Sequence, residues 1–298
     1  MLKILLYRTN LWVLVLLPGF SAAQSSTVAK SIKLPPELKE VSGMTRLPNG
    51  DLWLLNDSKN PADLFRFDPF QKKVVEVRHL AARNYDWEDL THDQAGNLYI
   101  GDFGNNYNKR QNLRIFRYHL ASGRLDSLPF RYPDQTSFPP AKTSDWNFNC
   151  EAMVFFQDSL HLFSKNVFKG DFICKHYVIP ITPGKETVAI LRDSIKLSGR
   201  VVTGAALSKD GKTLALTGYI MGKKLGFFPY TRASVIYFTD FQGSRFLRGK
   251  QHRKRLPKCG ISRQFESITP WDEQHWLAAN EGRKPQMQRI WRLERKKR

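Results

Sequence analysis

The chain of 298 residues is poor in cysteine, and it lacks the short motifs of several enzyme classes. Cys150, Cys174 and Cys259 are too few for a disulfide scaffold, and no CxxC pair indicates a zinc site. We expect Cys150 and Cys174 to be buried as small apolar residues. No GxSxG elbow, phosphate-binding loop or dinucleotide fingerprint occurs, so nucleophilic-serine and nucleotide chemistry have no local support.

Long apolar runs are also scarce, and the one we recognise stands at the N-terminus. Lys3 and Arg8 precede an apolar core at residues 11–20, which small residues follow at 21–23. This order predicts a cleaved signal peptide at residues 1–23 and a secreted or periplasmic domain at residues 24–298. The core is too short to cross a bilayer comfortably, and an uncleaved membrane anchor is the lesser alternative.

Acidic residues are outnumbered, with 27 Asp and Glu against 47 Lys and Arg and a formal net charge of +20. The basic residues concentrate at 244–258 and 294–298. Such a charge attracts nucleic acid, anionic lipid or acidic polysaccharide, but the export signal argues against nucleic acid. We therefore predict peripheral association with an anionic envelope surface through these two segments. The alternative is a solvated loop and tail.

Internal repeats are present where single motifs are absent. Each repeat has a Glu, a small or acidic residue, an apolar strand, a polar turn, a second apolar strand and a polar residue. Five segments follow this order: 39–57, 87–102, 150–165, 203–218 and 265–281. Their starting positions, Glu40, Glu88, Glu151, Gly204 and Glu266, are 48, 63, 53 and 62 residues apart. These intervals are close to those of propeller blades, which take about 40 to 50 residues.

Scattered Gly and Pro, many aromatic residues and the absence of helical periodicity agree with an all-β fold. We predict a single five-bladed β-propeller, with six blades as the alternative. The last repeat has one strand too few before the chain ends. Residues 26–34 alternate as a strand without a partner, so we expect them to close the ring as the outer strand of the last blade.

The acidic residues of the repeats should meet at one end of the propeller. If the turns at Asn49–Gly50, Ala95–Gly96 and Asp210–Gly211 lie at one face, the beginnings of the inner strands lie at the other. Carboxylates from separate repeats then converge on one channel mouth, although Thr203 and Gly204 interrupt the ring in the fourth repeat. Asn280 and Lys165 also occupy positions in this predicted mouth.

Converging carboxylates repel one another, so the mouth must take up a proton, a basic partner or a cation. Oxygen ligands suit a hard cation, and we take Ca²⁺ as the cofactor. The candidate metal ligands are Glu40, Glu151, Glu266, Asp57 and Asn106. The alternative is structural: a Glu at the start of an inner strand accepts hydrogen bonds from the backbone of the next blade.

The pattern resembles two groups of propellers. It is similar to the calcium-dependent lactonases and phosphotriesterases, which include gluconolactonase-like and paraoxonase-like enzymes, and closer to secreted phytase esterase-like and NHL-like propellers. The motifs that carry the resemblance are EVSGM (40–44), WEDL (87–90), NCEAM (149–153), VTGAALS (202–208) and FESIT (265–269). The resemblance implies a metal held on the top face by Glu, Asp and Asn, with Glu40 as a ligand. The lactonases carry Asn and Asp where this chain repeats Glu, and no catalytic His is matched.

Two classes of function follow. A metal-dependent hydrolase of lactones, esters or phosphoesters would use Glu88 or Asp102 as general base and Lys165 to stabilise negative charge. A non-catalytic module would bind a glycan, a peptide or an anionic surface, with Trp87, Trp146 and Tyr107 exposed at the rim. In either case we expect a monomer with a small-molecule or glycan ligand.

Overall fold

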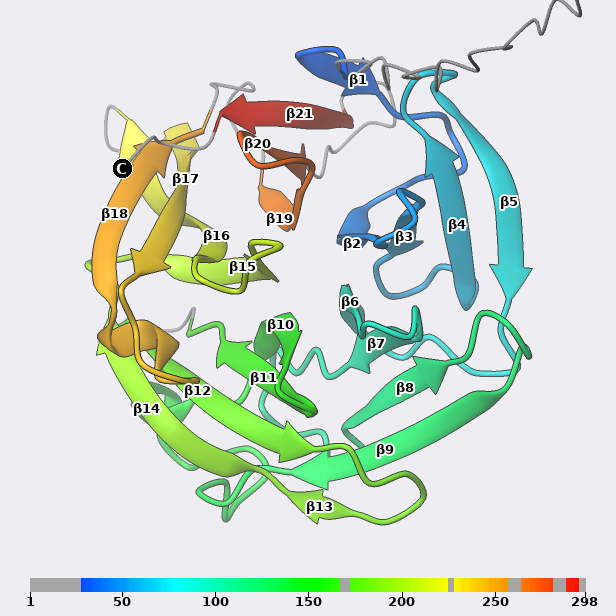
Figure 1. Cartoon of the computed structure of the whole chain (residues 1–298). Coiled ribbons are helices and arrows are strands. Elements are labelled where there is room, and N and C mark those ends of the chain that lie inside the picture. The colour runs from blue at the N-terminus through cyan, green and yellow to red at the C-terminus, as the bar shows by residue number, and fades with distance from the viewer. Residues whose placement is uncertain (1–27, 167–171, 225–227, 257–263, 281–287, 295–298) are drawn as a thin grey trace, which may run out of the picture.

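The computed structural model describes residues 28–166, 172–224, 228–256, 264–280 and 288–294, and these form a five-bladed β-propeller (Figure 1). The predicted all-β fold and the number of blades are confirmed. The predicted signal peptide lies outside the described residues. Within them, no helix has the length and apolar character needed to span a membrane.

Each blade is an antiparallel sheet whose first strand lies nearest the centre of the ring. Blade 1 consists of β2 (Val41–Arg46), β3 (Leu52–Asn56), β4 (Asp63–Asp68) and β5 (Lys73–His79). Blade 2 consists of β6 (Trp87–His92), β7 (Leu98–Asp102), β8 (Arg114–Tyr118) and β9 (Leu125–Arg131). Blade 3 consists of β10 (Cys150–Phe156), β11 (Ser159–Ser164), β12 (Ile173–Pro180) and β14 (Ile190–Lys196).

The remaining blades follow the same order. Blade 4 consists of β15 (Val201–Leu207), β16 (Leu214–Lys224), β17 (Phe228–Thr239) and β18 (Lys250–Arg255). Blade 5 consists of β19 (Phe265–Pro270), β20 (His275–Asn280), β21 (Arg289–Glu294) and β1 (Ser31–Lys33). A short strand, β13 (Thr187–Val188), adds in parallel to the outer edge of β9. Two short 3₁₀ helices span Thr143–Asp145 and Phe246–Arg248.

The ring closes as the sequence predicts, because β1 pairs with β21 in the last blade. Ile32 lies opposite Ile290, and the Arg289 guanidinium donates a hydrogen bond to the hydroxyl of Ser31 at 3.0 Å. The strand itself is shorter than the predicted segment, at three residues. Closure joins the two ends of the described chain, so no blade of the ring is left without its outer strand.

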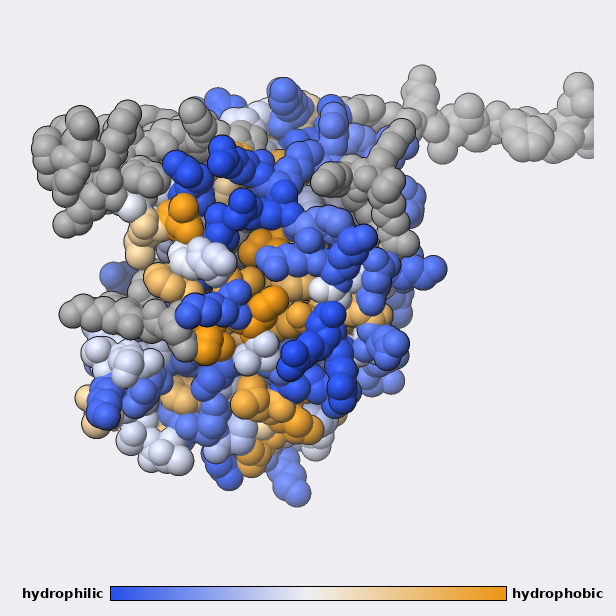
Figure 2. Space-filling model, turned by 90° about the vertical axis from the view of Figure 1, so that its left-hand side faces the viewer, coloured by the Kyte–Doolittle hydropathy of each residue, from blue (hydrophilic) through white to orange (hydrophobic). Residues whose placement is uncertain are grey.

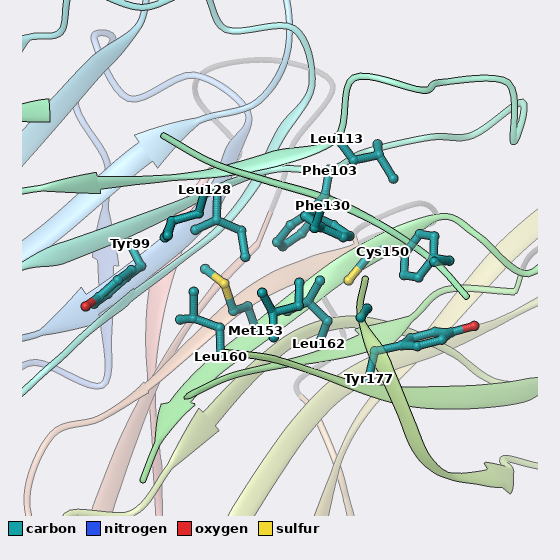
Figure 3. Packing of buried hydrophobic residues seen from close by; sticks show 14 of the residues in the cluster. Tyr99, Phe103, Leu113, Leu128, Phe130, Cys150, Met153, Leu160, Leu162 and Tyr177 are labelled. Carbon is teal, nitrogen blue, oxygen red and sulfur yellow. The ribbon is translucent and has the colours of Figure 1, made fainter. Parts of the chain in front are cut away.

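The hydrophobic core is divided into five clusters, and each one fills the space between two neighbouring blades. Figure 3 shows the cluster between blades 2 and 3, where Phe130 of β9 packs near Met153 of β10 and Leu162 of β11. Both faces of the inner strands are therefore buried, which is why they read as continuous apolar or small runs. Cys150 and Cys174 are free and buried, as expected; Cys259 lies outside the described residues.

Turns that contain glycine distinguish the two ends of the central channel. The β2–β3, β6–β7 and β15–β16 turns carry Gly50, Gly96 and Gly211 at φ of 99°, 80° and 66°, a conformation that favours glycine. The turns join the far ends of the inner two strands in each blade. We call the opposite end, where the five inner strands begin, the channel mouth.

Candidate metal centre at the channel mouth

A β-bulge at the start of every inner strand sets which residues are equivalent around the mouth. The pairing of the first two strands skips one residue in each blade, and the skipped residues are Ser42, Glu88, Glu151, Thr203 and Glu266. The bulged strand has one unpaired residue, which turns its side chain out of the regular ladder. Three of the five bulge residues are glutamates, and all three are buried.

The bulges correct the sequence-based alignment in blade 1. Ser42, and not Glu40, is equivalent to Glu88, because Glu40 precedes Val41 as Asp86 precedes Trp87. Glu40 is exposed, has a φ of 50°, and lies with its carboxylate 3.4 Å from the amide of Asn60. The metal-ligand role predicted for Glu40 therefore has no support from the bulge pattern.

Three carboxylates of blades 1 and 2 form a group with the spacing of a cation site. One oxygen from each of Asp57, Asp86 and Glu88 lies within 4.8 Å of the others. Asp57 follows β3, Asp86 precedes β6, and Glu88 is the bulge residue of β6. Asp57 and Asp86 are half-buried, whereas Glu88 is 6% exposed. Since Ca²⁺ binds oxygens at 2.3–2.6 Å, oxygens up to about 5 Å apart can share one ion.

The chain leaves space for these carboxylates at Gly104. A Cβ added at this residue would lie 2.3 Å from Oε1 of Glu88 and 2.4 Å from Oδ2 of Asp86. Its backbone N–H donates to the carbonyl of Asp86 at 3.1 Å, which fixes the loop against the acidic group. The cradle and the all-oxygen donor set both fit a hard cation.

Electrostatics at Glu88 point in the same direction. Burial raises the pKa of Glu88 well above its ordinary value, and repulsion from Glu151 adds to this. Asp57 and Asp86 raise the pKa of Glu88 further, whereas Lys165 opposes the shift. A proton or a bound cation would relieve the cost of this buried, repelled charge.

Asp102 is hydrogen-bonded to the backbone of Asp86, one of the three clustered carboxylate residues. It is fully buried, and its Oδ1 accepts hydrogen bonds from the Arg110 guanidinium at 2.9 Å and from the backbone N–H of Asp86 at 3.1 Å. Arg110 also donates to the carbonyl of Gly104 at 2.7 Å. Burial raises the pKa of Asp102, and the charge of Arg110 lowers it. These bonds hold together the two segments that carry Asp86, before β6, and Gly104, after β7.

A buried ion pair faces the triad from blade 3. The ammonium of Lys165 hydrogen-bonds both oxygens of Glu151, and the two side chains are 8% and 4% exposed. Asn149 donates to Oε1 of Glu151 at 3.2 Å and to Oδ1 of Asn106 at 3.1 Å. Asn106, predicted as a metal ligand, is exposed and reaches the cluster through Asn149.

Lys165 interacts electrostatically with several ionisable residues around the mouth. Burial lowers the pKa of Lys165, but the combined attraction of Glu151, Tyr219, Glu266 and Glu88 outweighs it and raises the pKa well above its ordinary value. Glu266 is 9% exposed. The ring of Tyr219 lies 5.7 Å from the ammonium, so this residue fills the gap expected in blade 4. Thr203, at the bulge of that blade, instead donates to the carbonyl of Phe265 at 2.5 Å.

Asp89 joins the blades below the mouth. Its carboxylate accepts the N–H of Leu90 at 2.8 Å, of Met153 at 2.6 Å and of Ala205, so it bridges β6, β10 and β15. The structural alternative foreseen for the glutamates therefore applies to this aspartate. The equivalent residues are small, and a Cβ on Gly43 would lie 2.8 Å from the N of Leu90. Because neighbouring inner strands approach so closely here, only small side chains fit at the positions equivalent to Asp89.

Three residues of the mouth were not predicted from the sequence: Asp86, Asn149 and Tyr219. Asp86 lies two residues before the bulge residue Glu88, and Asn149 lies two residues before the bulge residue Glu151. The predicted repeat did not include this position. The three acidic residues within 86–89 were the sequence feature that could have identified Asp86 as part of the mouth. Trp87, predicted at the exposed rim, is fully buried between blades 1 and 2, whereas Tyr107 is 65% exposed. The Trp146 indole donates to the carbonyl of Pro140 at 2.9 Å.

Comparison with known proteins supports the fold. No family model and no curated protein matches the chain. Among solved structures, the PQQ-bound form of an aldose sugar dehydrogenase from Streptomyces coelicolor is 12% identical, with a TM-score of 0.51 over 90% of this chain and 97% of that chain. At this identity, the likeness shows the propeller fold alone.

Two further matches have lower TM-scores. A streptogramin B lyase is 10% identical, with a TM-score of 0.45 over 90% of this chain and 87% of that chain. Hydrazine synthase from Kuenenia stuttgartiensis is 13% identical, with a TM-score of 0.42 over 84% of this chain. Our chain covers 57% of the length of that chain. The match to the sugar dehydrogenase confirms the predicted resemblance to propellers at the level of the fold.

Proposed function

We propose that the channel mouth binds a divalent cation, with Ca²⁺ as the first choice, through Asp57, Asp86 and Glu88. The observation that carries the proposal is the convergence of these three carboxylates from two blades, within 4.8 Å, around a glycine that leaves them space. Export, which the sequence predicts, would bring the protein to a compartment where weak Ca²⁺ sites of about 10⁻⁴–10⁻³ M can fill.

A hydrolase of lactones, esters or phosphoesters is the activity we propose for this mouth. A cation bound there would polarise the oxygen of the scissile group and acidify a bound water. Lys165 is suited to stabilise negative charge on the reacting oxygen, because its own charge is secured by Glu151. Asp102, predicted as a general base, is fully buried and bound to Arg110, so we do not propose this role for it.

Calorimetric titration of Ca²⁺ into the chelator-treated full chain tests cation binding. Glu88→Gln and Asp86→Asn should each weaken binding at least tenfold, because each removes a charged ligand. Glu273→Gln is the matched control, since Glu273 is exposed on the turn between β19 and β20, at the other end of the channel. If Ca²⁺ and Mg²⁺ give no saturable heat, or if the two variants bind like the wild type, the cation site is rejected.

Hydrolysis is tested separately on an aryl ester, a lactone and a phosphodiester, with Ca²⁺ and with chelator. A calcium-dependent rate that Lys165→Met and Glu151→Gln abolish would support the proposed activity. Saturable Ca²⁺ binding without turnover of any of the three substrates would favour the second candidate, a non-catalytic binding module. The exposed Tyr107, close in sequence to Asn106 of the mouth, is the observation that favours such a module.

A further inference from the structure

The basic segment at 244–258, for which a solvated loop was the alternative, contains an ordered edge strand. β18 pairs along its whole length with β17, and it forms the outer edge of blade 4. Gln251, Arg253 and Arg255 alternate on its exposed face, whereas His252 and Lys254 are less exposed. Figure 2 views the molecule from the side of β14 and β18, and strongly hydrophilic residues gather on this side. The strand therefore fixes its arginines at regular intervals.

A pocket of about 330 Å³ lies between this strand and the segment that links blades 3 and 4. Lys196 and Arg200 line one side, Gln251 and Arg253 line the other, and Ile236 also contributes. Arg253 lies opposite Ile236 in the β17–β18 ladder, so its guanidinium is held on a paired strand. The pocket is separate from the channel mouth, which the inner strands form.

Three positively charged residues line the pocket: Lys196, Arg200 and Arg253. Among the described residues, no ion pair involves Lys196, Arg200 or Arg253. Burial lowers the pKa of Arg200, and the charges of Arg253, Arg232 and Arg255 lower it further. Four guanidinium groups thus repel one another at one place on the surface, which an anion would relieve.

Arg200 also has an unused donor. Its Nη1 donates to the carbonyl of Ser198 at 3.2 Å, but its buried Nε has no acceptor among the described residues. A buried donor without an acceptor is unfavourable, and an anion seated in the pocket would supply the missing acceptor. Arginine presents its N–H groups as a planar fork that matches the oxygens of phosphate and sulfate.

We propose that this pocket binds a phosphate or sulfate group, which accepts hydrogen bonds from Arg200 and Arg253 and ion-pairs with Lys196. The group can belong to a free anion or to the headgroup of an anionic lipid, because both present the same oxygens. The site is independent of the cation site proposed for the channel mouth.

Titration of inorganic phosphate and of sulfate into the full chain, at constant ionic strength with chloride as the balancing anion, tests the pocket. Saturable binding is expected, and Arg200→Gln and Arg253→Gln should each weaken it at least tenfold. Arg83→Gln is the matched control, since Arg83 is exposed on the segment between blades 1 and 2 and its loss lowers the net charge equally. Thermal unfolding of each variant checks that the fold is retained.

Vesicles of phosphatidylglycerol in phosphatidylcholine distinguish the two sources of the group. Vesicle binding that both pocket variants reduce, and that free phosphate competes away, identifies the headgroup as the ligand. Phosphate binding without vesicle binding identifies a free anion. If phosphate and sulfate do not bind, or if Arg83→Gln weakens binding as much as Arg200→Gln, the pocket is rejected in favour of diffuse attraction by the net charge.

Discussion

Replacing Lys165 by methionine tests whether the buried ion pair holds the channel mouth together. The substitution keeps the length of the side chain and removes the cation, which leaves Glu151 buried at 4% exposure without its partner. Removal of one member of a buried ion pair typically costs about 3–5 kcal/mol. At about 2–4 °C per kcal/mol for a domain of roughly this size, the melting temperature should fall by about 6–20 °C.

The loss should depend on pH, and its sign follows from Glu151. Burial already raises the pKa of Glu151 in the folded protein, and without Lys165 the opposing attraction disappears. A folded-state pKa above the unfolded value means that stability is retained below the unfolded pKa, about 4.3, and is lost as pH rises. Lys165→Met should therefore be closest to the wild type at pH 4 and furthest from it at pH 7.5.

Urea unfolding at the two pH values measures both effects, with Lys142→Met as a control because Lys142 is exposed. The control should change the free energy of unfolding by less than about 0.5 kcal/mol. The double variant Lys165→Met/Glu151→Gln should recover part of the loss, since it removes the unpaired charge. A loss below about 1 kcal/mol for Lys165→Met, or an equal loss at both pH values, would refute this reasoning.

Three further predictions address other parts of the ring. Asp89→Asn should lower the free energy of unfolding by about 1–3 kcal/mol in urea, because an amide cannot accept all of the N–H groups that the carboxylate now accepts; an unchanged midpoint would contradict it. Gly104→Ala should weaken Ca²⁺ binding at least tenfold in calorimetry, because its Cβ displaces Glu88 and Asp86; wild-type affinity would show that the cradle is not needed. Burial lowers the pKa of His161 to about 3, so the unfolded chain gains a proton that the folded chain does not gain as pH falls below about 6.5. His161→Gln should therefore lose less stability than the wild type between pH 7 and 4.5 in urea, and parallel losses would contradict this.

The propeller fold was predictable because the same pattern of apolar and polar residues recurs along the chain. Each hairpin places apolar residues in two neighbouring core clusters, so the pattern recurs at blade intervals even though the blades share few residues. The closing strand was predictable for the same reason, since the last repeat has one strand too few. β18 was not, because its exposed basic residues hide the apolar alternation of a strand.

Which residues are equivalent around the mouth was less predictable, because the position of the β-bulge in each blade determines it. Alignment on the acids pairs Glu40 with Glu88, whereas the position of the bulge in the strand pairing makes Ser42 equivalent to Glu88. Asp102 reads as a further acid of the mouth, yet Arg110, eight positions later, holds it in the interior. Such pairings depend on loop conformation, which the sequence pattern does not contain.

The union of β1 with β21 has a consequence for how the protein is made. Arg289 and Ser31, which touch in the finished ring, are 258 positions apart, so the fifth blade cannot be completed until the strand that carries Arg289 has been synthesised. A nascent chain would carry four finished blades and an open seam. At high concentration, the first strand of one molecule could enter the seam of another, and slow, dilute refolding should favour the self-closed form.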